Sequence, residues 1–169
     1  MKKIIFIMLF AALSWQQAVA QQFTDGTLWY NVYSGTTAVE VAAKNKAAIG
    51  TAIAIPEQVS YEGVDYTVAS IGANAFQFDY LLTSVSIPNS IQSIGNGAFK
   101  LCYGLTSITI PNAVTSIGQG AFQGCSSLTA VTIPNSVTSI GPNAFYFCIG
   151  LTSVTIPDAV TSIGSDAFR

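Results

Sequence analysis

The sequence predicts a β-rich solenoid of about five 23-residue coils, closed at its amino-terminal end by a β-hairpin cap. Three observations lead to this fold class. The chain repeats itself every 23 residues, each repeat carries the same apolar positions, and only 8% of the 169 residues are charged although 50% are hydrophobic. Because ordinary soluble domains have about 25% charged residues, Ser, Thr, Asn, Gln and Gly must cover much of the surface.

The first twenty residues have the pattern of a secretory signal peptide (1–20). Lys2 and Lys3 form the positive start, residues 4–13 the apolar run, and Ala18-Val19-Ala20 the small-residue site, so we expect cleavage after Ala20. The apolar run is about half of the roughly 20 residues that a spanning helix needs. The mature chain would be secreted or held at the cell surface, without membrane insertion, with four basic and eight acidic residues and a net charge of −4.

Residues 21–67 lack the repeat and are predicted to form the amino-terminal β cap. An alternating pattern runs from Thr27 to Tyr33, turns at Ser34-Gly35 and returns from Thr37 to Val41, which is typical of a β-hairpin. A solenoid needs a cover over its terminal hydrophobic face, and this segment would provide one. A separate binding module is the alternative interpretation.

Residues 68–169 contain the repeat. Complete copies span Leu82 to Gly104, Leu105 to Ser127 and Leu128 to Gly150, a weaker copy precedes them, and a fourth covers residues 151–169. This last copy stops inside a coil and has no polar capping sequence. We therefore expect that the chain is truncated at its carboxyl-terminal end, and that its uncapped last coil would favour self-association.

Each unit is predicted to contain two short strands and a turn. The apolar positions of one copy are Leu128, Val131, Ile133, Val137, Ile140, Ala144 and Phe145. Val131 and Ile133 alternate as in a strand, with both side chains inward, and Pro134 ends it. Residues 137–140 form a second extended piece, Gly141 is expected to adopt a positive φ, and residues 143–148 turn with Phe145 in the core. A coil this small buries too little apolar surface to fold alone, so the coils must stack.

The repeat resembles the BspA-like (Treponema pallidum-type) leucine-rich repeat of bacterial surface proteins. The likeness covers residues 64–169 and rests on the period, the Ile-Pro step, the Ile-Gly step and the Ala-Phe-x-x-Cys step. Residues 61–68 also look like the strand pair that leads into the first repeat of such proteins. The resemblance implies a leucine-rich-repeat solenoid that binds extracellular molecules, with host matrix proteins and other cell surfaces among the ligand classes. It carries no fixed set of ligand residues.

The composition excludes several kinds of chemistry. The sequence contains no histidine, which removes histidine-based nucleophile systems, metal sites and acid/base catalysis. Asp79, Asp158 and Asp166 are scattered over the repeats and offer no obvious facing carboxylate pair. No cluster of Lys and Arg could neutralise a run of phosphates, so nucleic acid is not an expected partner. We expect a protein that is not an enzyme and that uses no cofactor or metal.

The three cysteines occupy one column of the repeat. Cys102, Cys125 and Cys148 are each 23 residues apart, and Asp79 takes this position in the first unit. A straight column does not present thiols tetrahedrally around a metal ion. We expect buried, reduced thiols, although an oxidising compartment leaves open a disulfide between one adjacent pair.

Two surfaces are candidate binding sites for an extracellular protein or glycan. The first, which we call the aromatic edge, consists of residues 77–80, 100–103, 123–126 and 146–149, which vary between units. Its candidate ligand-binding residues are Phe78, Tyr80, Tyr103, Tyr146 and Phe147. The second is the strand face with the threonines Thr106, Thr109, Thr129, Thr132, Thr152 and Thr155. The sequence thus predicts an adhesin-like protein-binding chain, and the alternative is a structural or self-associating repeat module of a larger surface protein.

Overall fold

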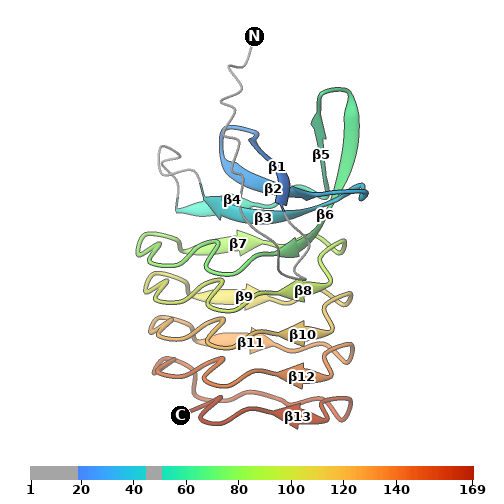
Figure 1. Cartoon of the computed structure of the whole chain (residues 1–169). Helices are drawn as coiled ribbons and strands as arrows, with labels where there is room; N and C mark the ends of the chain where they lie inside the picture. The colour runs from blue at the N-terminus through green and yellow to red at the C-terminus, as the bar shows by residue number, and fades with distance from the viewer. Residues whose placement is uncertain (1–18, 45–50) are drawn as a thin grey trace.

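A computed structural model describes residues 19–44 and 51–169 of the chain, and within these ranges every regular element is a β-strand. Successive coils stack along one axis, with the first three strands at one end and β13 at the other (Figure 1). The strands are β1 (Val19–Thr24), β2 (Leu28–Tyr33), β3 (Ala38–Lys44), β4 (Ala52–Ala54), β5 (Gln58–Tyr61), β6 (Val64–Ile71), β7 (Ser84–Ser86), β8 (Ser93–Ile94), β9 (Ser107–Thr109), β10 (Ser116–Ile117), β11 (Ala130–Thr132), β12 (Ser139–Ile140) and β13 (Ser162–Ile163).

The predicted amino-terminal hairpin is present. β2 and β3 pair antiparallel, with Asn31 opposite Glu40, and β1 adds a further antiparallel strand outside β2 that sequence analysis did not foresee. Residues 1–18 of the proposed signal peptide lie outside the described residues. Cleavage after Ala20 would remove two residues of β1 and leave four of them paired with β2.

The hairpin joins the repeats through a parallel pair. β3 runs alongside β6, with Val41 opposite Ile71, and the side chains of Val39, Val41, Val68 and Ile71 enter one continuous hydrophobic core. β5 and β6 form the predicted strand pair that leads into the first repeat. The proposed boundary at residue 68 falls inside β6, and the role of residues 21–67 as a cap stays a prediction.

Each coil contributes one short strand to a long parallel ladder. The central path of the sheet ends in the order β6, β8, β10, β12 and β13, and the paired residues are one period apart, as for Ile117 and Ile140. β4 with β7 and β9 with β11 form two separate parallel pairs in a second column (Figure 1). The two extended pieces expected in each unit are confirmed in the coils of β7, β9 and β11. Residues 152–157, the corresponding piece of the last coil, form no strand.

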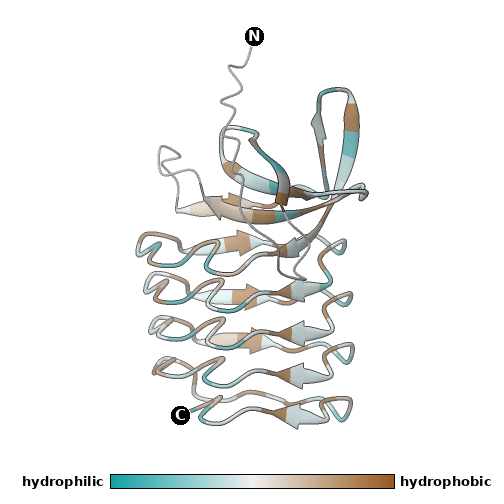
Figure 2. Cartoon of the chain, viewed as in Figure 1, coloured by the Kyte–Doolittle hydropathy of each residue, from teal (hydrophilic) through white to brown (hydrophobic). Residues whose placement is uncertain are grey.

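The interior repeats as regularly as the backbone does. Hydrophobic segments recur at the same place in successive coils (Figure 2). Ile133 is buried as expected, whereas Val131 is only partly buried. The centre of the core is a file of phenylalanine rings, which are Phe76, Phe99, Phe122, Phe145 and Phe168.

These rings stack face to face along the solenoid axis. Neighbouring ring centroids are 5.0 to 5.3 Å apart, and the ring planes differ by 2° to 9°. Phe99 and Phe122 are fully buried, and Phe145 is 1% exposed. The predicted inward file is confirmed, and its spacing is close to the roughly 4.8 Å that separates hydrogen-bonded strands.

The expectation of a positive φ at Gly141 is wrong. One column of positive φ values lies two residues later in the unit, at positions that include Asn143 (φ 56) and Gly120 (φ 59). Gly141 is needed for a different reason, because a Cβ there would lie 2.6 Å from the backbone nitrogen of Gln119 in the preceding coil. Glycine permits this close approach of the two backbones.

Removal of one ring from the middle of the file should destabilise the whole stack. We expect Phe122→Ala to lower the free energy of unfolding by about 3–5 kcal/mol, because it leaves a cavity between two buried neighbours. Phe147→Ala removes the same side-chain atoms from a ring that is 59% exposed, and should change stability by no more than about 0.5 kcal/mol. Urea unfolding of both variants tests this, and equal losses would contradict the stacking role.

Candidate functional site

The aromatic edge is built on a stack of turns that hydrogen-bond to one another. The amide of Phe99 donates to the carbonyl of Ala121 at 2.7 Å, and the amide of Phe122 donates to the carbonyl of Ala144 at 2.8 Å. The amides of Leu101 and Gly124 make equivalent bonds to the next coil at 2.7 Å. The turns therefore have the interstrand bonding of a parallel sheet, although they contain no regular strand, and they hold the edge in place.

Each turn contains one residue with a left-handed backbone at the same position. Phe78, Leu101, Gly124 and Phe147 occupy one column of the repeat and have φ values of 64°, 63°, 75° and 57°. Such a conformation is ordinary for glycine and uncommon for bulky residues. This feature was not predicted, because the column contains a glycine in only one of its four positions.

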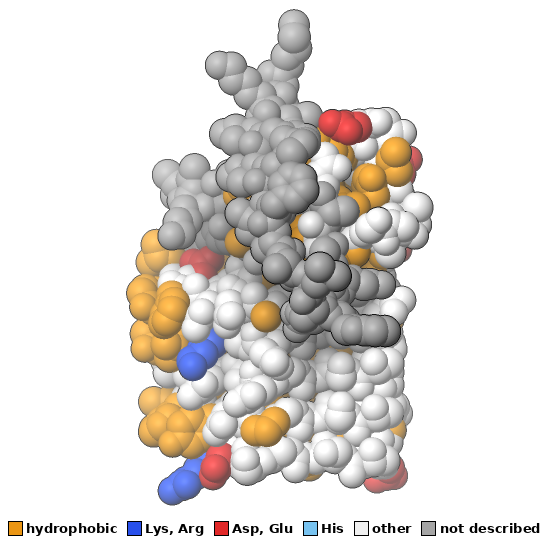
Figure 3. Space-filling view, viewed as in Figure 1, with side chains coloured by type: hydrophobic (Ala, Val, Ile, Leu, Met, Phe, Trp, Pro, Cys, Tyr) orange, Lys and Arg blue, Asp and Glu red, His pale blue; other side chains and the backbone are white. Residues whose placement is uncertain are grey.

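The structure brings the predicted aromatic residues together in two patches on this edge. Phe78, Tyr80 and Tyr103 form the first patch with Leu81, and their exposed fractions are 50%, 52%, 45% and 72%. Tyr146 and Phe147 form the second patch with Ile149, which is 77% exposed. Figure 3 shows two hydrophobic areas along one margin of the molecule, with other side chains between them.

Aromatic contacts order both patches. The rings of Tyr80 and Tyr103 stack with centroids 5.2 Å apart and planes 10° apart, and Phe78 meets Tyr80 edge-on at 6.2 Å. In the second patch, Tyr146 meets Phe147 at 4.5 Å with an interplanar angle of 81°. Leu81 and Ile149 were not predicted as members of the patches, although Ile149 lies in the variable segment 146–149 and Leu81 directly follows the segment 77–80.

The coil of residues 105–127 forms the gap between the two patches. It has Gly124 and Ser126 where the preceding coil carries Leu101 and Tyr103 and the following coil carries Phe147 and Ile149. A Cβ on Gly124 would lie 2.5 Å from the side chain of Leu101, so the glycine also allows Leu101 to lie over the gap.

The threonine face is exposed, but its candidate side chains carry only a hydroxyl and a methyl group. All six candidate threonines are exposed, and the hydroxyls of Thr106 and Thr129 donate to the carbonyls of Thr83 at 3.4 Å and Thr106 at 3.2 Å. These two hydroxyls tie one coil to the previous coil. Thr152 lines a pocket at the last coil, but the face has small hydroxyl side chains where the aromatic edge has large exposed hydrophobic ones, so the aromatic edge is the stronger candidate.

The cysteine column is structural. Cys102, Cys125 and Cys148 are buried and reduced, as expected, and their thiols donate to the carbonyls of residues 76, 99 and 122 at 3.1 Å. Burial raises the pKa of the Cys125 thiol above its usual range and that of Cys148 to about 11. A thiol that keeps its proton is a poor nucleophile and a poor metal ligand.

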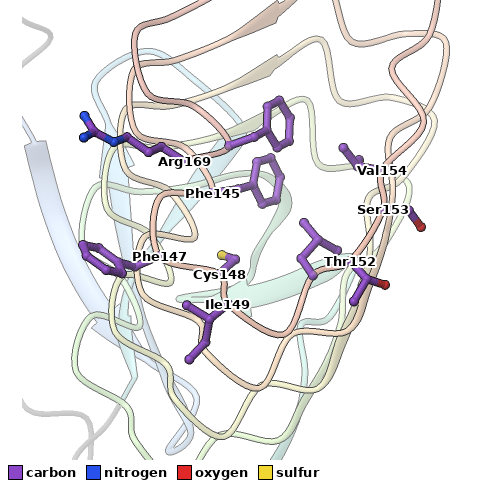
Figure 4. Close-up of a pocket in the computed structure, with 10 residues that line it drawn as sticks. Phe145, Phe147, Cys148, Ile149, Thr152, Ser153, Val154 and Arg169 are labelled. Atoms are coloured by element: carbon purple, nitrogen blue, oxygen red, sulfur yellow. The ribbon is translucent and has the colours of Figure 1, made fainter.

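A pocket lies under the last coil. Its lining includes Phe145, Cys148, Val154 and Phe168, which belong to the core columns of the repeat. In Figure 4 the ring of Phe145 lies within the coil, while Phe147 points away from it. Ile163 is 50% exposed although its counterpart Ile140 is buried. The pocket is thus an open part of the repeating core, and self-association at this end stays a prediction.

The described residues contain neither a cluster of metal ligands nor a membrane-spanning helix. Within residues 19–44 and 51–169, no group of three or more Cys, Asp or Glu side chains is arranged to hold a metal ion. The same part of the chain contains no helix with the length and hydrophobicity to cross a membrane.

The stacked coils, the parallel ladder and the inward phenylalanine file define a β-rich leucine-rich-repeat solenoid. The chain belongs to the BspA-type leucine-rich-repeat family of bacterial surface proteins, because the family model described as "BspA type Leucine rich repeat region" matches residues 64–169 in six copies. Alignment of the sequence with itself predicts about five coils over nearly the same residues.

Solved structures of similar proteins share this fold. A leucine-rich repeat protein from Bacteroides ovatus is 36% identical with a TM-score of 0.80, and the match covers 86% of this chain and 38% of that one. A leucine-rich cell surface protein from Faecalibacterium prausnitzii is 26% identical with a TM-score of 0.50, covering 91% of this chain and 53% of that one. The Treponema pallidum leucine-rich repeat protein, at 20% identity and a TM-score of 0.51, shares the fold alone. The match covers 83% of this chain and 85% of that one. No curated protein matches the chain significantly.

The buried thiols predict a loss of stability at alkaline pH. The pKa of Cys148 is raised in the folded state, so its contribution to stability is complete below the unfolded pKa of about 8.5 and is lost as the pH rises toward about 11. We expect the free energy of unfolding to fall between about pH 7 and about pH 9.5, and to fall less in a variant with all three cysteines changed to alanine. Urea titrations at both pH values measure the difference, and identical pH dependence in the two proteins would contradict the burial argument.

Proposed function

We propose that this chain is a non-catalytic, secreted or surface-exposed protein that binds extracellular proteins in the manner of an adhesin. The aromatic edge is the observation that carries the proposal. Large hydrophobic side chains that stay exposed as a group are typical of interaction sites, and tyrosine is enriched where proteins bind one another.

The edge also has the rigidity that binding favours. Its side chains stand on turns that are hydrogen-bonded from coil to coil, so little conformational freedom is lost when a partner docks. Solenoids use such extended repeat surfaces for binding, and positions that do not contribute to the core can vary without cost to the fold.

Family membership supports the cellular setting. The matched family consists of bacterial surface proteins, and the relative from Faecalibacterium prausnitzii is itself described as a cell surface protein. A signal peptide over residues 1–20 would deliver the chain to that location. The chain spans 38% and 53% of the first two relatives, so any activity of a longer protein is part of the proposal.

Substitution at the edge tests the proposal. The full chain is measured by surface plasmon resonance against a panel of purified extracellular matrix proteins, and we expect Tyr103→Ser combined with Tyr146→Ser to weaken binding about tenfold or more. The midpoint of thermal unfolding should stay nearly unchanged, because neither side chain belongs to the ring file. Equal binding by the double variant would discard the edge, and no binding by the unaltered chain to any member of the panel would contradict the proposed function.

A further inference from the structure

We propose that the aromatic edge binds an acidic polypeptide segment whose apolar side chains occupy the two patches, with Lys100 contacting its carboxylates. This inference rests on the proposed function and adds the class of partner. It follows from the orientation of the rings, the cost of holding them outward, the distribution of charge, and the spacing of the patches.

The orientation of the rings favours a polypeptide over a glycan. A sugar ring packs against the open face of an aromatic ring, but Tyr80 and Tyr103 lie face to face at 5.2 Å and cover one face of each other. Phe147 is engaged edge-on by Tyr146 at 4.5 Å. The edge therefore offers ring edges, phenol hydroxyls and the aliphatic side chains of Leu81 and Ile149, which suit apolar side chains and backbone groups of a protein partner.

The left-handed backbone at Phe78, Leu101 and Phe147 is energetically unfavourable, and packing of the core does not require these side chains there. A left-handed conformation is unfavourable for a residue with a side chain, because its Cβ comes too close to the following carbonyl oxygen. Gly124 shows that glycine fits this column, yet Phe78, Leu101 and Phe147 occupy its other positions. Two of these side chains are at least half exposed, so little burial offsets the cost. Strain of this kind concentrates at binding sites.

The charge distribution selects an acidic partner. Lys100 and Arg169 are the basic residues of positions 51–169, and both fall in the column directly after the inward phenylalanine. Arg169 pairs with Asp166 at 3.3 Å. Lys100 follows Phe99 and precedes Leu101, and it stands beside the first patch. On a chain with a net charge of −2, the edge also carries Asp79 beside Tyr80, and Lys100 is the basic side chain that it offers to the carboxylates of an acidic segment.

The spacing of the patches fits a polypeptide that crosses one coil. Tyr103 and Phe147 belong to coils that are two steps apart, or about 10 Å at a strand spacing of about 4.8 Å. An extended chain covers that distance in about three residues. In the intervening coil Gly124 is buried beside the Leu101 side chain and Ser126 is half-buried, so this coil presents no third aromatic ring between the partner's two anchoring side chains.

Defined peptides test the inference on the full chain. The probe is a fluorescein-labelled twelve-residue peptide that alternates Glu with Leu or Phe, and its binding is followed by fluorescence anisotropy. Matched peptides carry Lys in place of Glu, or Ser in place of Leu and Phe, and hyaluronan fragments serve as an anionic glycan. We expect binding of the acidic, apolar peptide alone, weakened by added salt.

Variants of the protein identify the contact. Lys100→Gln should weaken peptide binding about fivefold, and Tyr80→Ser combined with Tyr103→Ser by about tenfold or more. Gln92→Glu makes the same change in net charge at an exposed position outside the edge, and should leave binding unchanged. Circular dichroism confirms that each variant keeps its fold.

Each other result overturns the inference. Equal binding of the lysine peptide would remove the charge argument, and equal binding of the serine peptide would remove the patches. Hyaluronan binding that is lost in the tyrosine variant would make the partner a glycan. If no peptide binds while a matrix protein does, the choice of an acidic segment is wrong and the proposed protein-binding function stands. If neither a peptide nor a matrix protein binds, both the inference and the proposed function are wrong.

Discussion

The structure depends on a match between two distances. Parallel strands pair at about 4.8 Å, and aromatic rings stack at a similar separation. The file from Phe76 to Phe168 has ring spacings of 5.0 to 5.3 Å, so one coil height satisfies both the backbone hydrogen bonds and the core. A glycine beside each turn, such as Gly118 or Gly141, keeps the backbones close enough for this match. Each coil is therefore stable only between its neighbours.

This constraint also determines where a binding site can lie. The inward positions of each coil are occupied by aromatic rings, aliphatic side chains and thiols that repeat from coil to coil. Apart from the cysteines, the side chains of the segments after the phenylalanine do not belong to the inward columns. The backbone of these segments is nevertheless fixed by intercoil hydrogen bonds, such as the one from the amide of Leu101 to the carbonyl of Gln123. The outcome is a rigid edge with variable side chains. Exposed aromatic and aliphatic groups gather there because the coil offers few other positions where a large side chain neither enters the core nor lies on the strand face.

Much of the fold was predictable from the sequence, because apolar positions that recur every 23 residues indicate directly that the coils stack. The period, the short strands, the hairpin before the repeats and the inward place of Phe99, Phe122 and Phe145 follow from apolar columns. The role of Gly141 does not, because it comes from a contact with Gln119 in another coil. Local pattern likewise did not reveal β1 or the left-handed Phe78 and Phe147. The aromatic edge could be located from variable positions, but the gap at Gly124 and the ring orientations required the structure.

Removal of one complete period tests the central claim most directly. Deletion of residues 105–127 joins Gly104 to Leu128 in register, so Phe99 would stack on Phe145 and every ladder would close again. The account predicts a folded, β-rich protein with one cooperative urea transition of reduced slope, while deletion of residues 105–116 breaks the register and prevents folding. Equal behaviour of the two deletions, whether both fold or both fail, would contradict a structure held together by coil-to-coil register.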